Sequence, residues 1–336
     1  MKTKAAVLTR PLEIKTDLVE LPPVGSHDVM VRVKACGVCP FDVRLYRGLS
    51  KTNYPKVLGH EVAGEVVEVG GQVANVAKGD MVALYPALRC GRCSYCLSGQ
   101  ENLCVDTKWP IGGFVDYSVM PSGNAFKYSG ISAEEAAFTE PLSCCLNGMM
   151  RVRLSPGDDV VIIGDGPIGQ LHLQLAQAMG AGRVVVTGLV KQRLERAARL
   201  GASVVDANGD SVKEVKEIVG PLGADVVVVA VGSSSALETG LKMVKRGGVV
   251  VQFAGIYPET DIPISSRFVH YSEAYLTGSS DSTRLHIARA LKLLENRRVK
   301  VNDFITHRYS IEDAKKGIES AAELTGFKVM IVPSNS

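Results

Sequence analysis

The 336-residue sequence has no long hydrophobic run and no cluster of basic residues. The apolar stretch at residues 224–231 is short and contains Asp225, so we expect no membrane-spanning segment. A formal net charge of only +3 argues against nucleic acid or a membrane surface as a partner. The first residues lack the apolar core of a secretory signal, and we therefore expect a cytoplasmic protein.

Cysteine, by contrast, is well represented, with eight residues of which four are tightly spaced. In a reducing compartment such a cluster holds metal more often than it forms disulfides. The spacing is Cys90-x2-Cys93-x2-Cys96-x7-Cys104. Four thiolates can surround one Zn²⁺ tetrahedrally with no open position, which indicates a structural zinc site. A disulfide pair conflicts with the compartment, and a nucleic-acid zinc ribbon would need more basic and aromatic neighbours.

A glycine-rich turn at residues 160–169, VVIIGDGPIG, indicates nucleotide binding. A buried β-branched strand runs into the turn, apolar residues then recur at helical spacing, and a second β-branched run follows at 184–187. This is the pattern of a βαβ unit in which backbone N–H groups and a helix N-terminus receive a pyrophosphate. The predicted cofactor-binding residues of the turn are Gly164, Gly166, Pro167, Ile168 and Gly169.

Cofactor choice is predicted from the end of the second β-branched run. A dinucleotide fold that takes NAD usually has an Asp or Glu there for the ribose 2′-hydroxyl, whereas this chain has Gly188. We expect no carboxylate at this position to repel a 2′-phosphate. Lys191 and Arg193 are close enough in sequence to pair with one. The sequence therefore predicts NADP as the preferred cofactor and NAD as the alternative.

Strands and helices alternate from residue 160 to 278, which predicts a parallel, doubly wound sheet. Before this region the chain has alternating strand patterns at 5–9, 28–34, 65–69 and 82–84. After it come amphipathic helices at 285–294 and 311–324, the second closed by Gly326, and a final strand at 327–332. With 46% hydrophobic residues, a chain of this length is expected to form about two domains.

Cys39, His60 and Glu61 form a second candidate metal group. Thiolate, imidazole and carboxylate are the ligands of an open zinc site, which leaves a fourth position for water or substrate. Two other interpretations stay open at this point. Cys36 and Cys39 match a redox C-x-x-C, and a histidine beside a glutamate is often a structural pair.

Taken together, the motifs resemble the zinc-dependent medium-chain dehydrogenase/reductase family over nearly the whole chain. They are C-G-V-C-x-x-D, G-H-E-V-A-G, the four-cysteine lobe, E-P-L-S at 140–143 and G-D-G-P-I-G. The glutamate of E-P-L-S resembles the polyol (sorbitol) and threonine dehydrogenase branch. The resemblance implies an α/β fold, with a Rossmann domain at 147–278. It also implies a discontinuous, mainly β GroES-like catalytic domain at 1–146 and 279–336, with a zinc lobe at 88–106 and the active cleft between the two domains.

Within this family resemblance, Cys39 and His60 match the catalytic zinc ligands, and either Glu61 or Glu140 completes the set. Asp42 matches the carboxylate that orients the ligating histidine. The chain departs from the family at the proton relay, where Phe41 and Arg44 replace a hydroxyl and a histidine. Phenylalanine cannot carry a proton and arginine stays charged. We therefore expect zinc-bound water, Glu61 or Glu140 to share that task, and Arg44 to bind a polar or anionic substrate group.

The sequence thus predicts a zinc-dependent enzyme that interconverts a secondary alcohol and its ketone by hydride transfer with NAD(P). The substrate is expected to be a polyol, a sugar-derived alcohol or an amino alcohol. Two zinc ions per chain and a homodimer or homotetramer are implied by the resemblance. Two alternatives are a reductase of quinones or enals without catalytic zinc, and a non-catalytic zinc-lobe binding protein.

Overall fold

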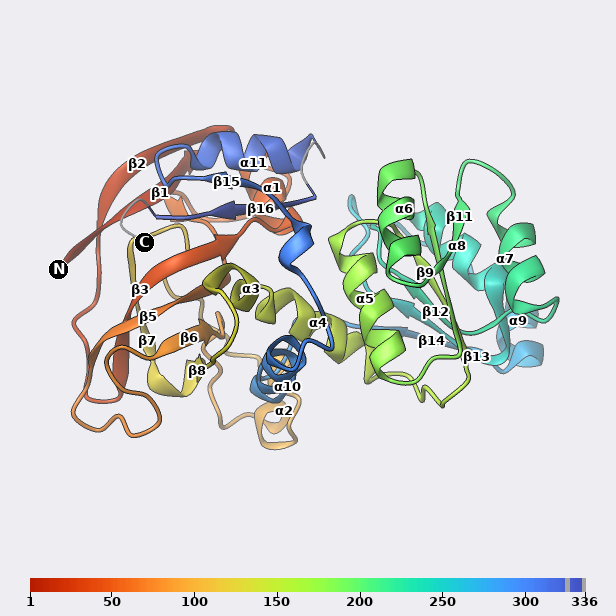
Figure 1. The fold of residues 1–336 in the computed structure, drawn as a ribbon, viewed down its shortest axis with the longest axis horizontal. Coiled ribbons are helices and arrows are strands. Elements are labelled where there is room, and N and C mark those ends of the chain that lie inside the picture. Colours follow the sequence, from red (N-terminus) through yellow and green to blue (C-terminus); the bar gives the residue numbers. More distant parts are fainter. Residues whose placement is uncertain (324–326, 334–336) are drawn as a thin grey trace. The chain divides into compact units, whose positions relative to one another are not determined.

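A computed structural model describes residues 1–323 and 327–333, and it divides the chain into two compact units (Figure 1). The first unit comprises residues 1–143 and the described residues from 282 onward, and the second comprises residues 144–281. The sequence placed these divisions at 146/147 and 278/279. Across the described part of the chain, no helix has both the length and the apolar character needed to cross a bilayer.

The first unit is built on a seven-stranded sheet in the order β15-β16-β3-β5-β6-β8, with β7 paired to β3. A three-stranded sheet, β2-β1-β4, lies in the same unit. Alternating valines of β3 are buried on one face of the sheet and join a core that includes Leu8, Val31, Val62 and Phe114. The strands are β1 (Lys2–Arg10), β2 (Glu13–Glu20), β3 (Asp28–Gly37), β4 (Lys56–Val57), β5 (Glu61–Val69), β6 (Met81–Leu84), β7 (Tyr117–Pro121), β8 (Ala125–Lys127), β15 (Ile305–Tyr309) and β16 (Lys328–Ile331).

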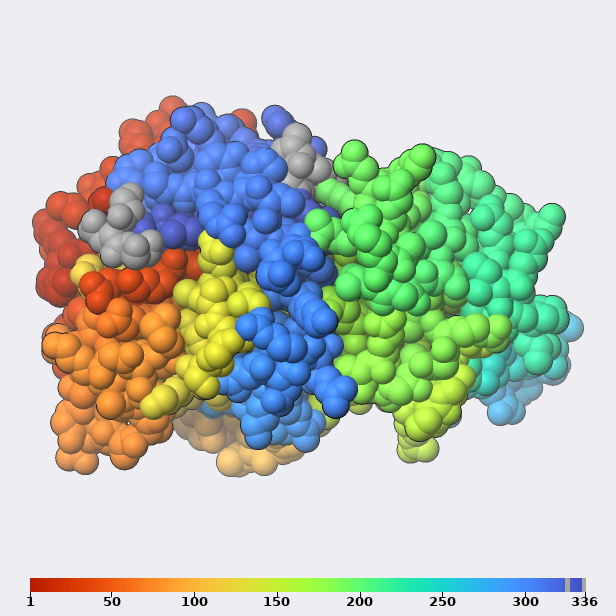
Figure 2. All heavy atoms as spheres, in the orientation of Figure 1, coloured from red at the N-terminus to blue at the C-terminus, as the bar shows by residue number. Residues whose placement is uncertain are grey.

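The last strand of this unit returns to the seven-stranded sheet. Strand β16 pairs antiparallel with β3, with Ile331 opposite Cys36. Figure 2 shows the C-terminal segment, in blue, packed against the N-terminal strands, in red. The helices are α1 (Pro40–Tyr46), α2 (Ser94–Leu97), α3 (Ala133–Ala137), α10 (Arg284–Glu295) and α11 (Ala314–Ala322), and α4 (Thr139–Met149) runs across the boundary into the second unit.

The second unit has a six-stranded sheet in the order β11-β10-β9-β12-β13-β14, and every neighbouring pair is parallel. The strand order reverses between β9 and β12, so the glycine-rich turn after β9 lies at the switch point where α/β sheets bind ligands. This confirms the predicted doubly wound sheet. The strands are β9 (Asp159–Ile163), β10 (Arg183–Gly188), β11 (Ser203–Asp206), β12 (Ala224–Val229), β13 (Val244–Gln252) and β14 (Tyr275–Gly278), and the helices are α5 (Pro167–Ala178), α6 (Lys191–Arg199), α7 (Ser211–Val219), α8 (Ser234–Met243) and α9 (Ser266–Ser272).

One strand boundary differs from the prediction, and the start of one helix also matters for the site. Strand β5 starts at Glu61 instead of residue 65, so Glu61 lies on a sheet and not in a loop. Helix α6 starts at Lys191, which places Lys191 and Arg193 in its first turn. The predicted end of the last helix at Leu324 and its cap at Gly326 lie outside the described residues.

His172 on α5 is an unusual feature of the second unit's core. It is fully buried and lies edge to face against Phe253, with ring centroids 4.5 Å apart. Neither ring nitrogen has a hydrogen-bond partner among the described residues. Burial lowers the pKa of His172 to about 3, because the low-dielectric core disfavours the charged form. The imidazole is therefore neutral in the folded protein across the physiological range.

His172→Leu is expected to reduce the acid sensitivity of the second unit. Between the folded pKa of about 3 and the unfolded value of 6.5, the unfolded chain binds a proton that folded His172 does not. Stability therefore falls as the pH drops, by about 1.4 kcal/mol per pH unit from this group. Melting curves of both proteins between about pH 8 and pH 4.5 measure the effect.

The comparison at about pH 8 is the internal control, because there the imidazole is neutral in both states and any difference reports packing alone. If wild type and variant lose stability equally on acidification, His172 is not a source of the acid sensitivity.

Candidate functional site

Cys39 is held at the start of helix α1 by the local sequence. It is the N-cap residue, Pro40 follows at the first helical position, and Asp42 completes a capping box. The Cys39 sulfur accepts a hydrogen bond from the Phe41 N–H at 3.5 Å. The sequence Cys-Pro-x-Asp therefore both begins the helix and fixes the direction of the thiol.

Asp42 ties this helix to the segment that carries His60. One carboxylate oxygen accepts from the Cys39 N–H at 3.0 Å, and the other accepts from the Gly59 N–H at 3.0 Å. The second oxygen also lies 3.6 Å from Nδ1 of His60. Burial raises the pKa of Asp42, but the His60 charge and these hydrogen bonds outweigh it, so the pKa lies below its usual value. Asp42 is thus an anion that orients the imidazole.

Glu61 is almost fully buried at the start of β5 and meets a lysine from the end of the chain. Its Oε2 lies 2.5 Å from Nζ of Lys328, which is itself buried on β16. Nζ also donates to the Val38 carbonyl at 3.1 Å. Burial lowers the pKa of Lys328, but the negative charges of Glu61, Cys39 and Glu140 together outweigh this and leave the pKa above its usual value. Lys328 therefore fixes one oxygen of Glu61.

Cys39, His60 and Glu61 converge on one point. Each offers a ligand atom, and these atoms all lie within 4.8 Å of one another. Burial alone would lower the pKa of His60, yet the negative charges of Asp42 and Cys39 raise it well above its usual value. An imidazole surrounded by anions in this way indicates a site that favours positive charge. Sulfur, nitrogen and oxygen donors at this spacing fit a zinc ion.

Glu140 lies on α4 and is not part of this group of three. Its charge nevertheless raises the pKa of Lys328, so it lies within electrostatic range of the Glu61 ion pair. Its backbone carbonyl accepts from the Ser143 hydroxyl at 2.6 Å. The structure thus brings both candidate carboxylates close to Lys328 but only Glu61 into the group.

Phe41 and Arg44 extend from the same helix as Cys39. The Phe41 ring lies edge to face with His60 at 6.2 Å, and the Arg44 guanidinium lies over the Phe41 ring at 5.5 Å. Phe41 is 41% exposed. Within residues 1–323 and 327–333, no carboxylate forms an ion pair with Arg44. The guanidinium is therefore linked to His60 only through the Phe41 ring, and no carboxylate of the described chain pairs with it.

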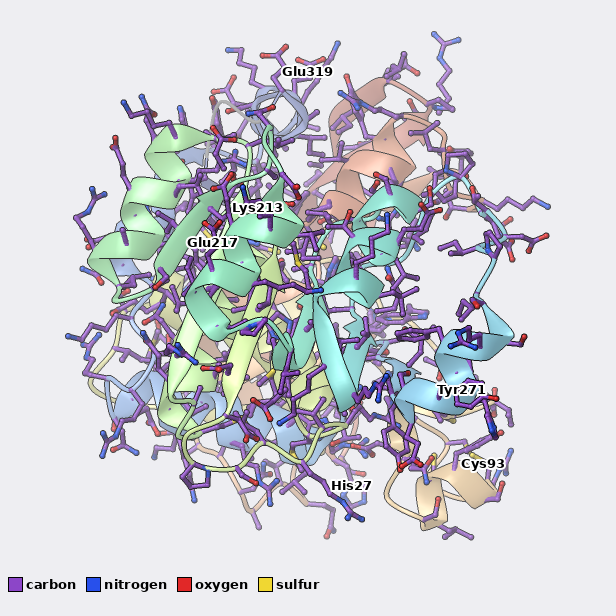
Figure 3. The ribbon with its side chains drawn as sticks, turned by 90° about the vertical axis from the view of Figure 1, so that its right-hand side faces the viewer. His27, Cys93, Lys213, Glu217, Tyr271 and Glu319 are labelled. Atoms are coloured by element: carbon purple, nitrogen blue, oxygen red, sulfur yellow. The ribbon has the colours of Figure 1, made fainter. Side chains whose placement is uncertain are left out.

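The four-cysteine lobe surrounds α2 and its neighbouring turns, where Figure 3 labels Cys93. The sulfurs of Cys90, Cys93, Cys96 and Cys104 all lie within 4.8 Å of one another. Backbone N–H groups of Cys90 and Cys93 point at the sulfurs of Cys104 and Cys90, each at 3.4 Å. The Cys90 N–H lowers the pKa of Cys104, which favours the thiolate. Four sulfurs with inward N–H donors fit a closed zinc site.

The glycine-rich turn of the second unit has the features of an anion cradle. Gly166 is the N-cap of α5 and offers no side-chain cap, and Pro167 is the first helical residue. The first-turn N–H groups are thus left for a ligand. A Cβ on Gly169 would lie only 1.9 Å from the Gly164 carbonyl oxygen, so glycine is needed for the close contact between helix and strand. These residues fit a dinucleotide pyrophosphate.

The interpretation that no carboxylate lies at the end of β10 is wrong. Gly188 ends the strand as expected, but the side chain of Asp165 reaches across from the glycine-rich turn and packs against it. Asp165 Oδ2 accepts from the backbone N–H groups of Leu189 and Val190 at 2.9 and 2.8 Å. Arg193 follows in the first turn of α6, 3.8 Å from the Asp165 carboxylate.

Comparison with known proteins identifies the family of this chain. Residues 25–130 match the alcohol dehydrogenase GroES-like domain, and residues 167–296 match the zinc-binding dehydrogenase domain. The chain is 33% identical to sorbitol dehydrogenase of Bacillus subtilis (strain 168) over 345 residues, which covers 98% of this chain and 97% of the relative. The chain belongs to the zinc-dependent medium-chain dehydrogenase/reductase family.

Other relatives of this dehydrogenase support the same assignment. L-idonate 5-dehydrogenase of Vitis vinifera is 34% identical, over 93% of this chain and 89% of the relative. An NADP-bound structure from Sinorhizobium meliloti 1021, assigned as a zinc-binding dehydrogenase, has a TM-score of 0.93 and 32% identity, over 99% of this chain and all of that chain. The protein is thus a zinc-dependent alcohol dehydrogenase that uses a nicotinamide cofactor, as the sequence predicted, and nothing favours the two alternative functions.

Two residues of this dehydrogenase's site were missed from the sequence. Lys328 is the one charge within β16, KVMI, and a charge in an otherwise buried strand was the available signal. Asp165 lies between two glycines of the turn, and nothing local indicates that its side chain crosses to β10. Both side chains reach their partners, Glu61 and Gly188, only through tertiary contacts.

Proposed function

We propose that this dehydrogenase oxidises a secondary hydroxyl of a polyol or sugar-derived alcohol, with amino alcohols as the second substrate class. The names of its relatives support this choice, since they include sorbitol, L-idonate, D-arabinitol and L-threonine dehydrogenases. The observation that carries the proposal is the convergence of ligand atoms of Cys39, His60 and Glu61 within 4.8 Å of one another.

In this proposal Cys39, His60 and Glu61 hold the catalytic zinc. Asp42 keeps a proton on Nδ1 of His60 and so fixes the ring, while Lys328 engages one oxygen of Glu61 and leaves the other for the metal. When Glu61 binds the metal, the negative charge of Glu140 still stabilises the Lys328 cation. A zinc ion bound there supplies Lewis-acid stabilisation of negative charge on the alcohol oxygen during hydride transfer. Cys90, Cys93, Cys96 and Cys104 hold a second, structural zinc.

NADP is the proposed preferred cofactor, held at Gly164 to Gly169 with Lys191 and Arg193 near its 2′-phosphate. The NADP-bound relative from Sinorhizobium meliloti supports this preference. The zinc clusters need reduced thiols, which favours the cytoplasm. For the hydroxyl proton, Phe41 offers no acceptor, so of the two candidate carboxylates Glu140, which is not assigned to the metal here, is proposed to help move it.

A homodimer or homotetramer is proposed through strand β14, an edge of the six-stranded sheet. Tyr275 and Leu276 on this strand are 68% and 42% exposed, and Tyr271 on α9 is 61% exposed (Figure 3). An exposed edge strand with large apolar side chains favours pairing with a second chain. A second copy of the same strand would offer matching backbone groups and apolar surface.

Metal analysis separates the two candidate carboxylates. Wild-type protein is expected to hold one zinc for each of the two ligand groups, and Glu61→Gln is expected to lose the catalytic zinc and about 100-fold or more in kcat/KM. Glu140→Gln, the matched control, is expected to keep both zinc ions. The ligand assignment is overturned if the Glu140 variant is the one that loses zinc.

Arg44→Ala is expected to raise KM about tenfold for aldonates and sugar-alcohol phosphates, and to leave KM for neutral polyols nearly unchanged. The reason is that Arg44 lies over the Phe41 ring, which in turn contacts His60, and that it has no carboxylate partner in the described chain. Arg47→Ala is the control, because Arg47 is exposed at the end of the same helix. If the two substitutions change KM equally for every substrate, Arg44 does not bind the substrate.

Light scattering tests the proposed interface. Wild-type protein is expected to show the mass of two or four chains, and the double variant Tyr271→Glu, Tyr275→Lys is expected to show the mass of one, because charge on an edge strand blocks pairing. Leu222→Lys is the control, at a position that is 81% exposed in a loop of the same unit. A monomeric wild type would refute the proposal directly.

A further inference from the structure

Position 188 has room only for glycine, because the side chain of Asp165 fills the space that a Cβ would need. A Cβ built on Gly188 would lie 2.3 Å from Oδ2 of Asp165 and 2.5 Å from its Cγ. The backbone of Gly188 is not left-handed, so conformation does not explain the glycine. Any larger residue at the end of β10 would collide with Asp165, and the two positions are therefore sterically linked.

The Asp165 side chain is rigidly held where it crosses to β10. It is only 7% exposed, and the N–H groups of Leu189 and Val190 both bind its Oδ2. Oδ1 faces the Arg193 guanidinium at 3.8 Å. Gln170 on α5 braces the same junction, because its amide donates to the backbone carbonyls of Asp165 and Arg193 at 3.2 and 2.9 Å. Helices α5 and α6 follow β9 and β10 here (Figure 1).

The position of this carboxylate matches a known requirement of dinucleotide folds. An acidic residue at the end of the second strand recognises the adenosine ribose, and it rejects a 2′-phosphate by charge repulsion. In this chain that strand ends in Gly188, and the carboxylate at its end comes instead from inside the glycine-rich turn. We propose that Asp165 is the ribose-recognising acid of this dehydrogenase and a determinant of its choice between NAD and NADP.

This inference rests on the proposed function, because it takes NAD or NADP as the cofactor. It places a negative charge in the cofactor site opposite the two cations proposed there. Lys191 and Arg193 attract a 2′-phosphate, whereas Asp165 repels it and favours the free 2′-hydroxyl. The ratio of the two affinities is set by this balance, so the chain accepts both cofactors. Removing the negative charge alone must then move the ratio in one direction, toward NADP.

Asp165→Asn separates charge from shape. The amide oxygen still accepts from Leu189 and Val190, and the side chain has the same size, so a purely structural role predicts no change in cofactor choice. A ribose-recognising acid predicts that the ratio of the Kd for NADP to the Kd for NAD falls about tenfold. Isothermal titration of the zinc-loaded full chain with each oxidised cofactor, without substrate, measures both constants. A ratio within about twofold of wild type would overturn the proposal.

A positional swap tests the steric link. Gly188→Asp alone is expected to weaken binding of both cofactors at least tenfold, because two side chains compete for one space. The double variant Asp165→Gly, Gly188→Asp returns the carboxylate to β10 and is expected to recover NAD binding relative to Asp165→Gly. Wild-type affinity in the Gly188→Asp variant would refute the link, and melting temperatures identify any variant that fails to fold.

The readout is cofactor binding, so it does not depend on the substrate. A protein that shows the expected shift in Kd but oxidises no polyol would refute the proposed substrate and leave the role of Asp165 intact. If the wild-type protein oxidises polyols but Asp165→Asn leaves the ratio of the two Kd values unchanged, the proposed substrate stands and the role of Asp165 is refuted.

Discussion

A buried carboxylate is stable only when donors and cations surround it, and this requirement organises both units of the protein. Asp42 in the first unit accepts from the N–H groups of Cys39 and Gly59 and faces His60. Asp165 in the second accepts from two backbone N–H groups and faces Arg193. In each unit one carboxylate joins segments that are distant in sequence, and the functional groups are positioned by that junction.

The ion pair of Glu61 and Lys328 explains why the first unit needs both ends of the chain. Each group is buried, and a buried charge without its partner costs several kcal/mol. Lys328 reaches Glu61 because β16 pairs with β3, which in turn pairs with β5. The carboxylate of the candidate metal group is thus stabilised by a residue 267 positions later in the chain, and the second unit is inserted between the two.

Much of this organisation could be predicted from sequence, because several signals are local. The cysteine spacing, the glycine-rich turn and the Cys-Pro-x-Asp helix start each depend on residues a few positions apart, and the structure contains all three. What was missed depends on long-range packing. The start of β5 at Glu61 follows from pairing with Gly37, and the place of Asp165 follows from its contact with Gly188. Neither contact has a periodic pattern that a single sequence reveals.

The contrast between Gly188 and Asp165 shows why a motif position is an incomplete guide to chemistry. Recognition of a ribose hydroxyl requires a carboxylate at one place in space, and the fold does not require it to come from one strand. Here the glycine-rich turn lies beside the end of β10, since β9 and β10 are adjacent and parallel. A short acidic side chain on the turn can therefore fill the space that a side chain on β10 vacates. The absence of an acid at one position consequently has meaning only when every side chain that can reach the same point is considered.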